Sequence, residues 1–131
     1  MTALLSDHDI EGHAQKLLDT LRTDGWLALY DIQLIFFRDI GLAENSSDRD
    51  IWRTAQENQM LLLTGNRNMD DDDSLEKTLR DENVSDSLPV LTIGKVENLE
   101  FRDYRSRCAV RIVEIVEDLN NYRGTGRLFI P

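Results

Sequence analysis

The chain has 131 residues, of which 15 are Lys or Arg and 25 are Asp or Glu, so its formal net charge at pH 7 is −10. This acidic balance repels phosphate backbones and disfavours a general electrostatic binder of nucleic acid, although an enzyme whose carboxylates hold divalent cations remains compatible with it. The single cysteine, Cys108, excludes an internal disulfide and every zinc site made of cysteines.

The length and the ordinary hydrophobic content of 40% predict one domain over residues 1–131. No apolar run approaches the roughly 20 residues of a membrane span. The first residues do not show the basic segment and following apolar segment of a signal peptide. We therefore expect a cytoplasmic protein that does not enter a membrane.

The first elements of the chain predict a strand that ends on a carboxylate, followed by a helix. Residues 3–6 form a short apolar run, which places Asp7 at the C-terminal end of a strand. Asp9 is expected to cap the helix that follows, and Asp24-Gly25 to end it. His8 and His13 are five positions apart, so a helix would not turn them toward one metal.

The next stretch is expected to hold a second strand and a second helix. Residues 26–37 are rich in aromatic and β-branched side chains, which favours a strand, with a short helix as the alternative. Ser46-Ser47-Asp48 then provides an N-cap for a helix whose buried face carries Ile51, Trp52 and Ala55. Asp48 and Asp50 fall in its first turn, where the helix dipole favours negative charge.

Residues 60–64 read Met-Leu-Leu-Leu-Thr and predict a central strand that is buried on both faces. Thr64, Asn66 and Asn68 come at its C-terminal end, where open α/β sheets gather their functional groups. The acidic run of residues 70–73 does not fit a calcium loop, since that motif requires a glycine at its sixth position and a glutamate at its twelfth. We interpret the run as a solvated loop.

The second half of the chain predicts a helix over residues 74–80, a strand over 88–94 and a helix over 104–119. Cys108 lies in the apolar stripe of the last helix and should be packed and inert. Arg107 and Arg111 lie on the opposite face, as on a solvated surface, with a nucleic-acid groove as the alternative. After the turn at Gly124–Gly126, the apolar tail should form an edge strand or an arm onto a second subunit in a homodimer.

The regular alternation of strands and helices predicts an α/β fold, a three-layer α/β/α sandwich with a mainly parallel sheet. In such a sheet Asp7, Asn66 and Asn68 share the C-terminal edge, and Asp48 joins them if the second helix begins there. Asp7, Asp48 and Asn66 would then be oxygen ligands for Mg²⁺ or Mn²⁺, with Asn68 beside them. A cation there could activate water and neutralise charge on a phosphodiester.

Three short motifs resemble the PIN-like domain superfamily, small metal-dependent ribonucleases that include toxins of bacterial toxin–antitoxin pairs. They are the apolar strand ending on Asp7, the Ser-Asp-x-x-Ile sequence of residues 47–51 and the Thr-x-Asx-x-Asx sequence of residues 64–68. The likeness extends over about residues 3–95 and is nearest to compact bacterial PIN-like proteins of unestablished activity. It implies a PIN-like fold, a catalytic set of Asp7, Asp48, Asn66 and Asn68, an RNA substrate and a cognate antitoxin or other protein partner.

The chain departs from the PIN-like pattern at the central strand. Asn66 and Asn68 stand where the pattern has two aspartates, which halves the anionic ligands of the site and should weaken metal binding. Asp9, Asp50 or Asp70 could replace the missing charge. The alternative is therefore a catalytically inactive PIN-like binding or regulatory module. A third hypothesis, a phosphatase of the haloacid dehalogenase type, rests on Asp7-His8-Asp9, but Glu11 stands where that family has Thr or Val.

Overall fold

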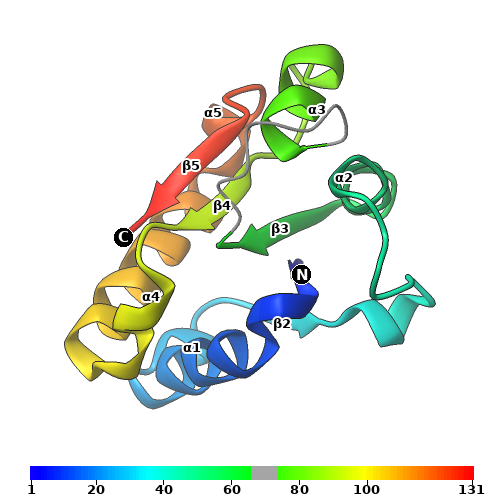
Figure 1. Cartoon of the computed structure of the whole chain (residues 1–131). Coiled ribbons are helices and arrows are strands. Elements are labelled where there is room, and N and C mark those ends of the chain that lie inside the picture. The colour runs from blue at the N-terminus through cyan, green and yellow to red at the C-terminus, as the bar shows by residue number, and fades with distance from the viewer. Residues whose placement is uncertain (66–73) are drawn as a thin grey trace.

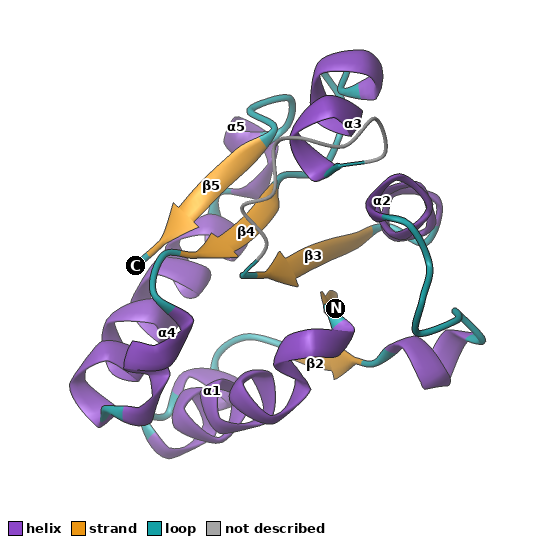
Figure 2. Cartoon of the chain, viewed as in Figure 1, coloured by secondary structure: helices purple, strands orange, loops and turns teal. Residues whose placement is uncertain are grey.

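A computed structural model describes residues 1–65 and 74–131 of the chain. Its centre is one five-stranded sheet in which all strand pairs are parallel and the strand order is β2-β1-β3-β4-β5. Helices cover both faces of the sheet (Figures 1 and 2). The predicted three-layer α/β/α sandwich is therefore confirmed. The strands are β1 (Thr2–Ser6), β2 (Ile32–Ile35), β3 (Met60–Thr64), β4 (Val90–Ile93) and β5 (Arg127–Ile130).

Within residues 1–65 and 74–131, five α-helices and four short 3-10 turns connect the strands. The α-helices are α1 (Glu11–Thr23), α2 (Asp48–Glu57), α3 (Leu75–Glu82), α4 (Arg102–Glu117) and α5 (Leu119–Tyr122). The 3-10 turns are η1 (His8–Ile10), η2 (Trp26–Ala28), η3 (Phe37–Ile40) and η4 (Val96–Glu100). Within the described part of the chain, no helix is long and apolar enough to cross a membrane.

The alternation of side chains along each strand builds two separate cores. Leu4 packs into one core with α1 and α4, whereas its neighbour Leu5 packs into the other with α2 and α3. The central strand divides in the same way, because Leu61 and Leu63 face α1 and α4 while Leu62 faces α2 and α3. A strand with apolar residues at every position is thus explained by burial on both faces.

The order in which strands are added to the sheet reverses at β1, although all strands stay parallel. From β1 the chain goes to β2 on one side, and it then returns to place β3 on the other side of β1, with Leu5 registered against both Ile35 and Leu62. Such a switch point opens a crevice at the C-terminal ends of the two strands, where doubly wound sheets bind ligands. Residues 3–6 and 60–63 pair in parallel, and the strand predicted over residues 60–64 is confirmed as the central strand of the sheet.

Local signals located the helices to within about two residues at their ends, since the helices predicted over 74–80 and 104–119 span 75–82 and 102–117. Ser47 and Ser74 cap α2 and α3, their hydroxyl oxygens accepting the backbone N–H groups of Asp50 and Lys77. The prediction for Asp9 was wrong: the chain leaves β1 through η1, and the α-helix begins at residue 11 without a side-chain cap.

The C-terminal tail forms an edge strand of the chain's own sheet. Strand β5 pairs in parallel with β4 from residue 127 to residue 130, and Ile130 is buried. Of the two alternatives for the tail, the edge strand is confirmed. Cys108 is buried on α4, as predicted, and burial raises the pKa of its thiol to about 12, so it remains an inert thiol at neutral pH.

Candidate functional site

Asp7 follows the last residue of β1 and lies at the switch point. Its backbone N–H donates to the carbonyl oxygen of Leu63 at 2.9 Å, which extends the ladder between β1 and β3 by one bond. Its carboxylate Oδ2 accepts a hydrogen bond of 2.7 Å from the hydroxyl of Thr64, the last residue of β3. Thr64 is itself buried, so it holds the carboxylate in one position at the mouth of the crevice.

The surroundings of Asp7 oppose its ionisation. Burial raises the pKa of the Asp7 carboxyl, and the charges of Asp9 and Asp48 raise it further. The hydrogen bonds from the Thr64 hydroxyl and the His8 backbone N–H act in the opposite direction, but the net pKa is above its ordinary value. Two other carboxylates, those of Asp9 and Asp48, therefore act on the Asp7 carboxyl, and a cation bound beside it would relieve this repulsion.

Asp48 is the first residue of α2. The sequence did not determine whether this helix begins at the C-terminal edge of the sheet. The Asp48 carboxylate Oδ2 accepts the backbone N–H of Leu75, the first residue of α3, at 3.2 Å. Both helices therefore begin at the C-terminal edge of the sheet, and the charge of Asp48 acts on Asp7. Asp48 therefore lies close enough to Asp7 for its charge to raise the pKa of the Asp7 carboxyl.

The other predicted site residues do not complete the group. Asn66, Asn68 and Asp70 lie outside the described residues. Asp9 is exposed in η1, within electrostatic range of Asp7, whereas Asp50 is exposed on α2 and does not contribute to the pKa of Asp7. Over residues 1–65 and 74–131, no three His, Cys, Asp or Glu side chains form a group that could hold a metal ion.

The residues present nevertheless fit one kind of cation. Mg²⁺ keeps several of its waters and is commonly held by one or two carboxylates together with the phosphates of a substrate. Asp7 and Asp48 supply two carboxylates, and their mutual repulsion would be relieved by a bound cation. The chemistry of these donors would suit a hard cation that is held weakly.

A network beside Asp7 was missed in the sequence because its members are distant along the chain. Glu11 accepts a hydrogen bond of 2.8 Å from Arg38 and lies 3.3 Å from the Nδ1 atom of His8. The other ring nitrogen of His8 lies 3.5 Å from Glu44. The guanidinium of Arg38 also stacks over the ring of Phe36, 4.4 Å from its centroid. Only the closeness of Glu11 and His8 on one turn could have been foreseen.

Gly65 follows the central strand for a steric reason. A Cβ atom at this position would overlap the Cγ2 atom of Val96, which lies in the turn after β4. The backbone that leaves β3 therefore packs directly against the neighbouring strand's connection. A glycine in a motif close to the switch point is thus required by packing and does not by itself indicate a phosphate loop.

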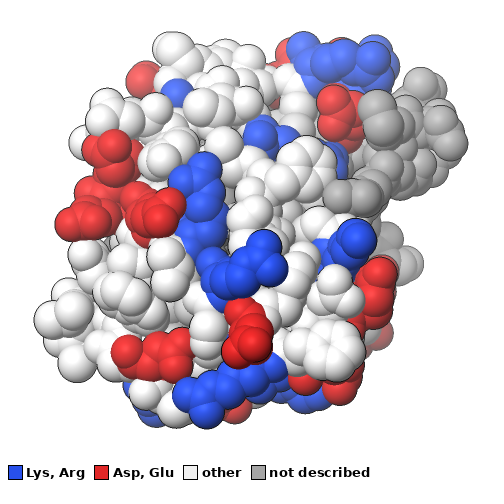
Figure 3. Space-filling view, turned by 90° about the vertical axis from the view of Figure 1, so that its left-hand side faces the viewer, with Lys and Arg blue, Asp and Glu red and all other residues white. Residues whose placement is uncertain are grey.

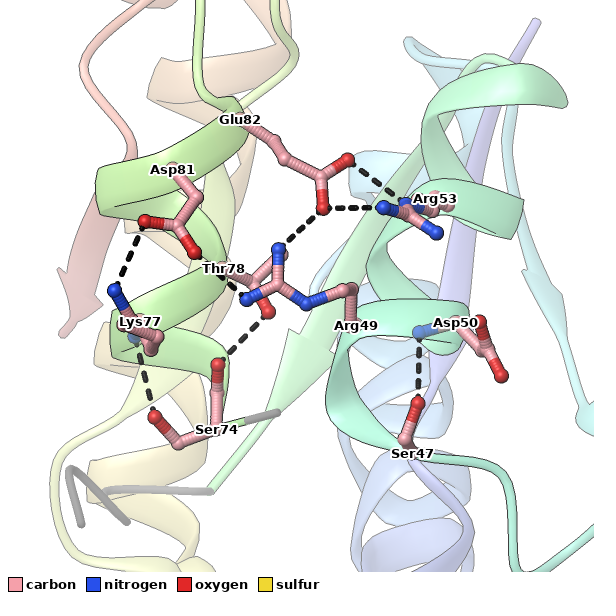
Figure 4. Close-up of polar contacts among 9 residues, drawn as sticks. All are labelled: Ser47, Arg49, Asp50, Arg53, Ser74, Lys77, Thr78, Asp81 and Glu82. Atoms are coloured by element: carbon pink, nitrogen blue, oxygen red, sulfur yellow. Dashed lines mark hydrogen bonds and ion pairs between the residues drawn. The ribbon is translucent and has the colours of Figure 1, made fainter. Parts of the chain in front are cut away.

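Oppositely charged side chains join α2 to α3 (Figure 4). This ion-pair cluster consists of Arg49, Arg53, Lys77, Asp81 and Glu82. Arg53 binds Glu82 at 2.8 Å, Arg49 binds Glu82 as well as Asp81, the latter at 2.9 Å, and Lys77 binds Asp81 at 3.2 Å. These bonds fix the separation of the two helices whose first turns meet near Asp7.

The surface charge is not uniformly acidic. On the face that forms the left-hand side of Figure 1, basic side chains gather in groups between the acidic ones (Figure 3).

Comparison with protein-family models, with curated proteins and with solved structures gave no match.

Proposed function

We propose that this protein is a metal-dependent ribonuclease of PIN-like type, with a depleted acidic site that binds Mg²⁺ or Mn²⁺ weakly through Asp7 and Asp48. One observation carries the proposal: Asp7 and Asp48 come from separate elements at the C-terminal edge of a doubly wound sheet, and the charge of Asp48 raises the pKa of the Asp7 carboxyl. The order of the PIN-like motifs supports it further.

The chain's own residues would each have a defined task. Thr64 holds one oxygen of the Asp7 carboxylate through its 2.7 Å hydrogen bond and so fixes the orientation in which the carboxylate would bind a cation. Asp48 adds the second charge, and its bond to Leu75 fixes it at the start of α3. When bound, a divalent cation supplies an activated water and charge neutralisation at a phosphodiester.

The second candidate function is a PIN-like binding or regulatory module without catalysis. A specific observation favours it: one oxygen of Asp48 already accepts the Leu75 N–H, so this carboxylate also has a structural role at the start of α3. The asparagines at positions 66 and 68 also favour the binding module, because they bring no charge to a metal ion.

Calorimetric titration of the full chain with Mg²⁺ and Mn²⁺ tests the first proposal. Asp48→Asn keeps an oxygen that can accept the Leu75 N–H but removes the charge, so it should weaken metal binding by roughly tenfold or more while the fold is retained. Asp7→Asn should abolish binding. A parent chain that binds neither ion at millimolar concentration would refute the metal site.

A variant that restores the PIN-like pattern separates the nuclease from the binding module. Asn66→Asp combined with Asn68→Asp adds two carboxylates to the sequence that follows β3. Metal should then raise the thermal midpoint of this variant more steeply than that of the parent, because the cation binds the folded state. Cleavage of single-stranded RNA should appear or rise in parallel. If neither change occurs, the binding-module function is the correct one.

A further inference from the structure

A groove of about 740 Å³ separates α3 from the edge strand β5, away from Asp7. The helix and the strand lie side by side in Figure 1, and an ion pair of 3.5 Å between Glu76 and Arg127 connects them. The side chains that form its walls are Glu76, Leu79, Arg80, Asn83, Arg127 and Phe129. Its volume lies within the roughly 300–1,000 Å³ of small-molecule sites.

The turn before β5 shapes one end of the groove. Gly124 and Gly126 adopt positive φ angles of 82° and 85°, which other residues rarely adopt. A Cβ atom on Gly124 would also lie 2.9 Å from the Ser85 carbonyl oxygen. Asn83, the C-cap of α3, donates from Nδ2 to the Gly124 carbonyl oxygen at 2.9 Å. The turn is thereby fixed to the end of the helix, and the groove is preformed.

Three chemically different groups face one ligand-sized space. Arg80 is exposed and takes part in no ion pair with the rest of the described chain, so its guanidinium can receive an anion. The Oδ1 atom of Asn83 is buried and accepts no hydrogen bond from the described residues, which leaves an acceptor in need of a donor. Phe129 is 50% exposed and offers an aromatic surface.

A ligand that satisfies all three groups carries an anion, a hydrogen-bond donor and a flat ring. A nucleotide has these features, because every nucleobase combines a π-face with at least one N–H donor and the phosphate supplies the charge. Leu79 adds an apolar contact, and Arg127 lies with its guanidinium 5.8 Å from the Phe129 ring centroid. An inorganic anion would leave the Asn83 acceptor and the aromatic surface unused.

We propose that the groove between α3 and β5 binds a nucleoside monophosphate, with the base on Phe129, a base N–H group donating to Asn83 and the phosphate on Arg80. This site is separate from the carboxylates of the switch point and does not depend on the ribonuclease proposal. Binding would place a nucleotide against α3, whose first turn contacts Asp48.

Calorimetry of the full chain with AMP and CMP tests the proposal in the absence of divalent metal. Phe129→Leu keeps an apolar side chain but removes the ring, and it should weaken binding by roughly tenfold through lost stacking. Arg80→Gln should weaken AMP binding by a similar factor and abolish the preference for AMP over adenosine. Arg22→Gln is the control, because Arg22 is likewise an exposed arginine in the last turn of a helix, although it is paired with Asp19 and lies outside the groove.

Three results would overturn the nucleotide site. The parent chain could show no saturable binding of AMP or CMP at millimolar concentration. Inorganic phosphate could bind as tightly as the nucleotides, which would mean that the base contributes nothing. Arg80→Gln and Phe129→Leu could bind AMP as the Arg22→Gln control does, with circular dichroism showing that all three variants are folded.

Discussion

At the end of β1, carboxylates face other carboxylates, whereas between α2 and α3 carboxylates face guanidinium groups. The Asp7 carboxyl has a raised pKa because burial and the charges of Asp9 and Asp48 oppose its ionisation. The Glu82 carboxyl has a lowered pKa because Arg53 and Arg49 donate hydrogen bonds to it. Both clusters include residues of α2. Ionisation of Glu82 stabilises the folded state, however, whereas ionisation of Asp7 destabilises it.

The charges of the ion-pair cluster stabilise the fold, whereas those of the carboxylates at the end of β1 do not stabilise one another. The ion-pair cluster fixes α2 to α3, which is a sufficient reason for its presence. At the switch point the charges of Asp9 and Asp48 instead oppose the ionisation of Asp7, since like charges at close range repel one another. Groups retained at a cost to stability are characteristic of binding and catalytic sites. The switch point is therefore the region where ligand-binding chemistry is expected.

The largest effect should come from removing the one strong hydrogen bond that the Asp7 carboxylate receives from a side chain. Thr64→Val keeps the shape of the buried side chain but cannot donate, so the free energy of unfolding at pH 7 should fall by about 1–3 kcal/mol. Chemical denaturation measures this change. Thr92→Val is the matched control: Thr92 is the registered neighbour of Thr64 and is also buried, but its hydroxyl has no partner among the described residues. The control variant should be as stable as the parent or more stable.

Removing the charge of Asp7 should have a smaller effect and the opposite sign. A carboxyl whose pKa is raised in the folded state contributes stability below its unfolded pKa of 3.8, and that stability is lost as the pH rises through the folded pKa. Asp7→Asn retains an acceptor for Thr64 and carries no charge, so it should be more stable than the parent at pH 7. The difference should vanish as the pH approaches 3.8. Denaturation curves across this range that show the variant less stable at pH 7 would contradict the role assigned to the charge.

Sequence patterns predicted the sheet, the serine cap of α2 and the start of α3 because these features depend on neighbours along the chain. The apolar runs that end at Asp7 and Thr64 marked the two central strands, and burial on both faces explains why they lack polar alternation. Ser47 and Ser74 were recognisable because a cap bonds to an N–H group only three residues ahead. Local rules thus gave the fold and placed Asp7 at the sheet edge.

Patterns could not predict contacts between distant segments. The bond from Leu75 to Asp48 spans 27 positions, and nothing in residues 47–51 signals that this carboxylate reaches the start of another helix. The ion pair of Arg49 with Glu82 spans 33 positions, and the bond of Arg38 to Glu11 spans 27. The Asp9 prediction failed locally, because Asp9 lies in the turn η1 and the α-helix starts two residues later.

The smallest effect should come from neutralising one carboxylate of the ion-pair cluster. Because Asp81 and Glu82 have lowered pKa values, their stabilising contribution is present above the unfolded values of 3.8 and 4.5 and is lost as the pH falls through the folded ones. Glu82→Gln should therefore lower the thermal midpoint at pH 7 and reduce its dependence on pH below 4.5. The change should be modest and should shrink in high salt, since solvent screens these half-exposed pairs.

Glu97→Gln, on an exposed residue without an ion pair in the described chain, should leave the midpoint unchanged. A midpoint that rises in Glu82→Gln, as it should in Asp7→Asn, would show that the two clusters do not differ in the way proposed.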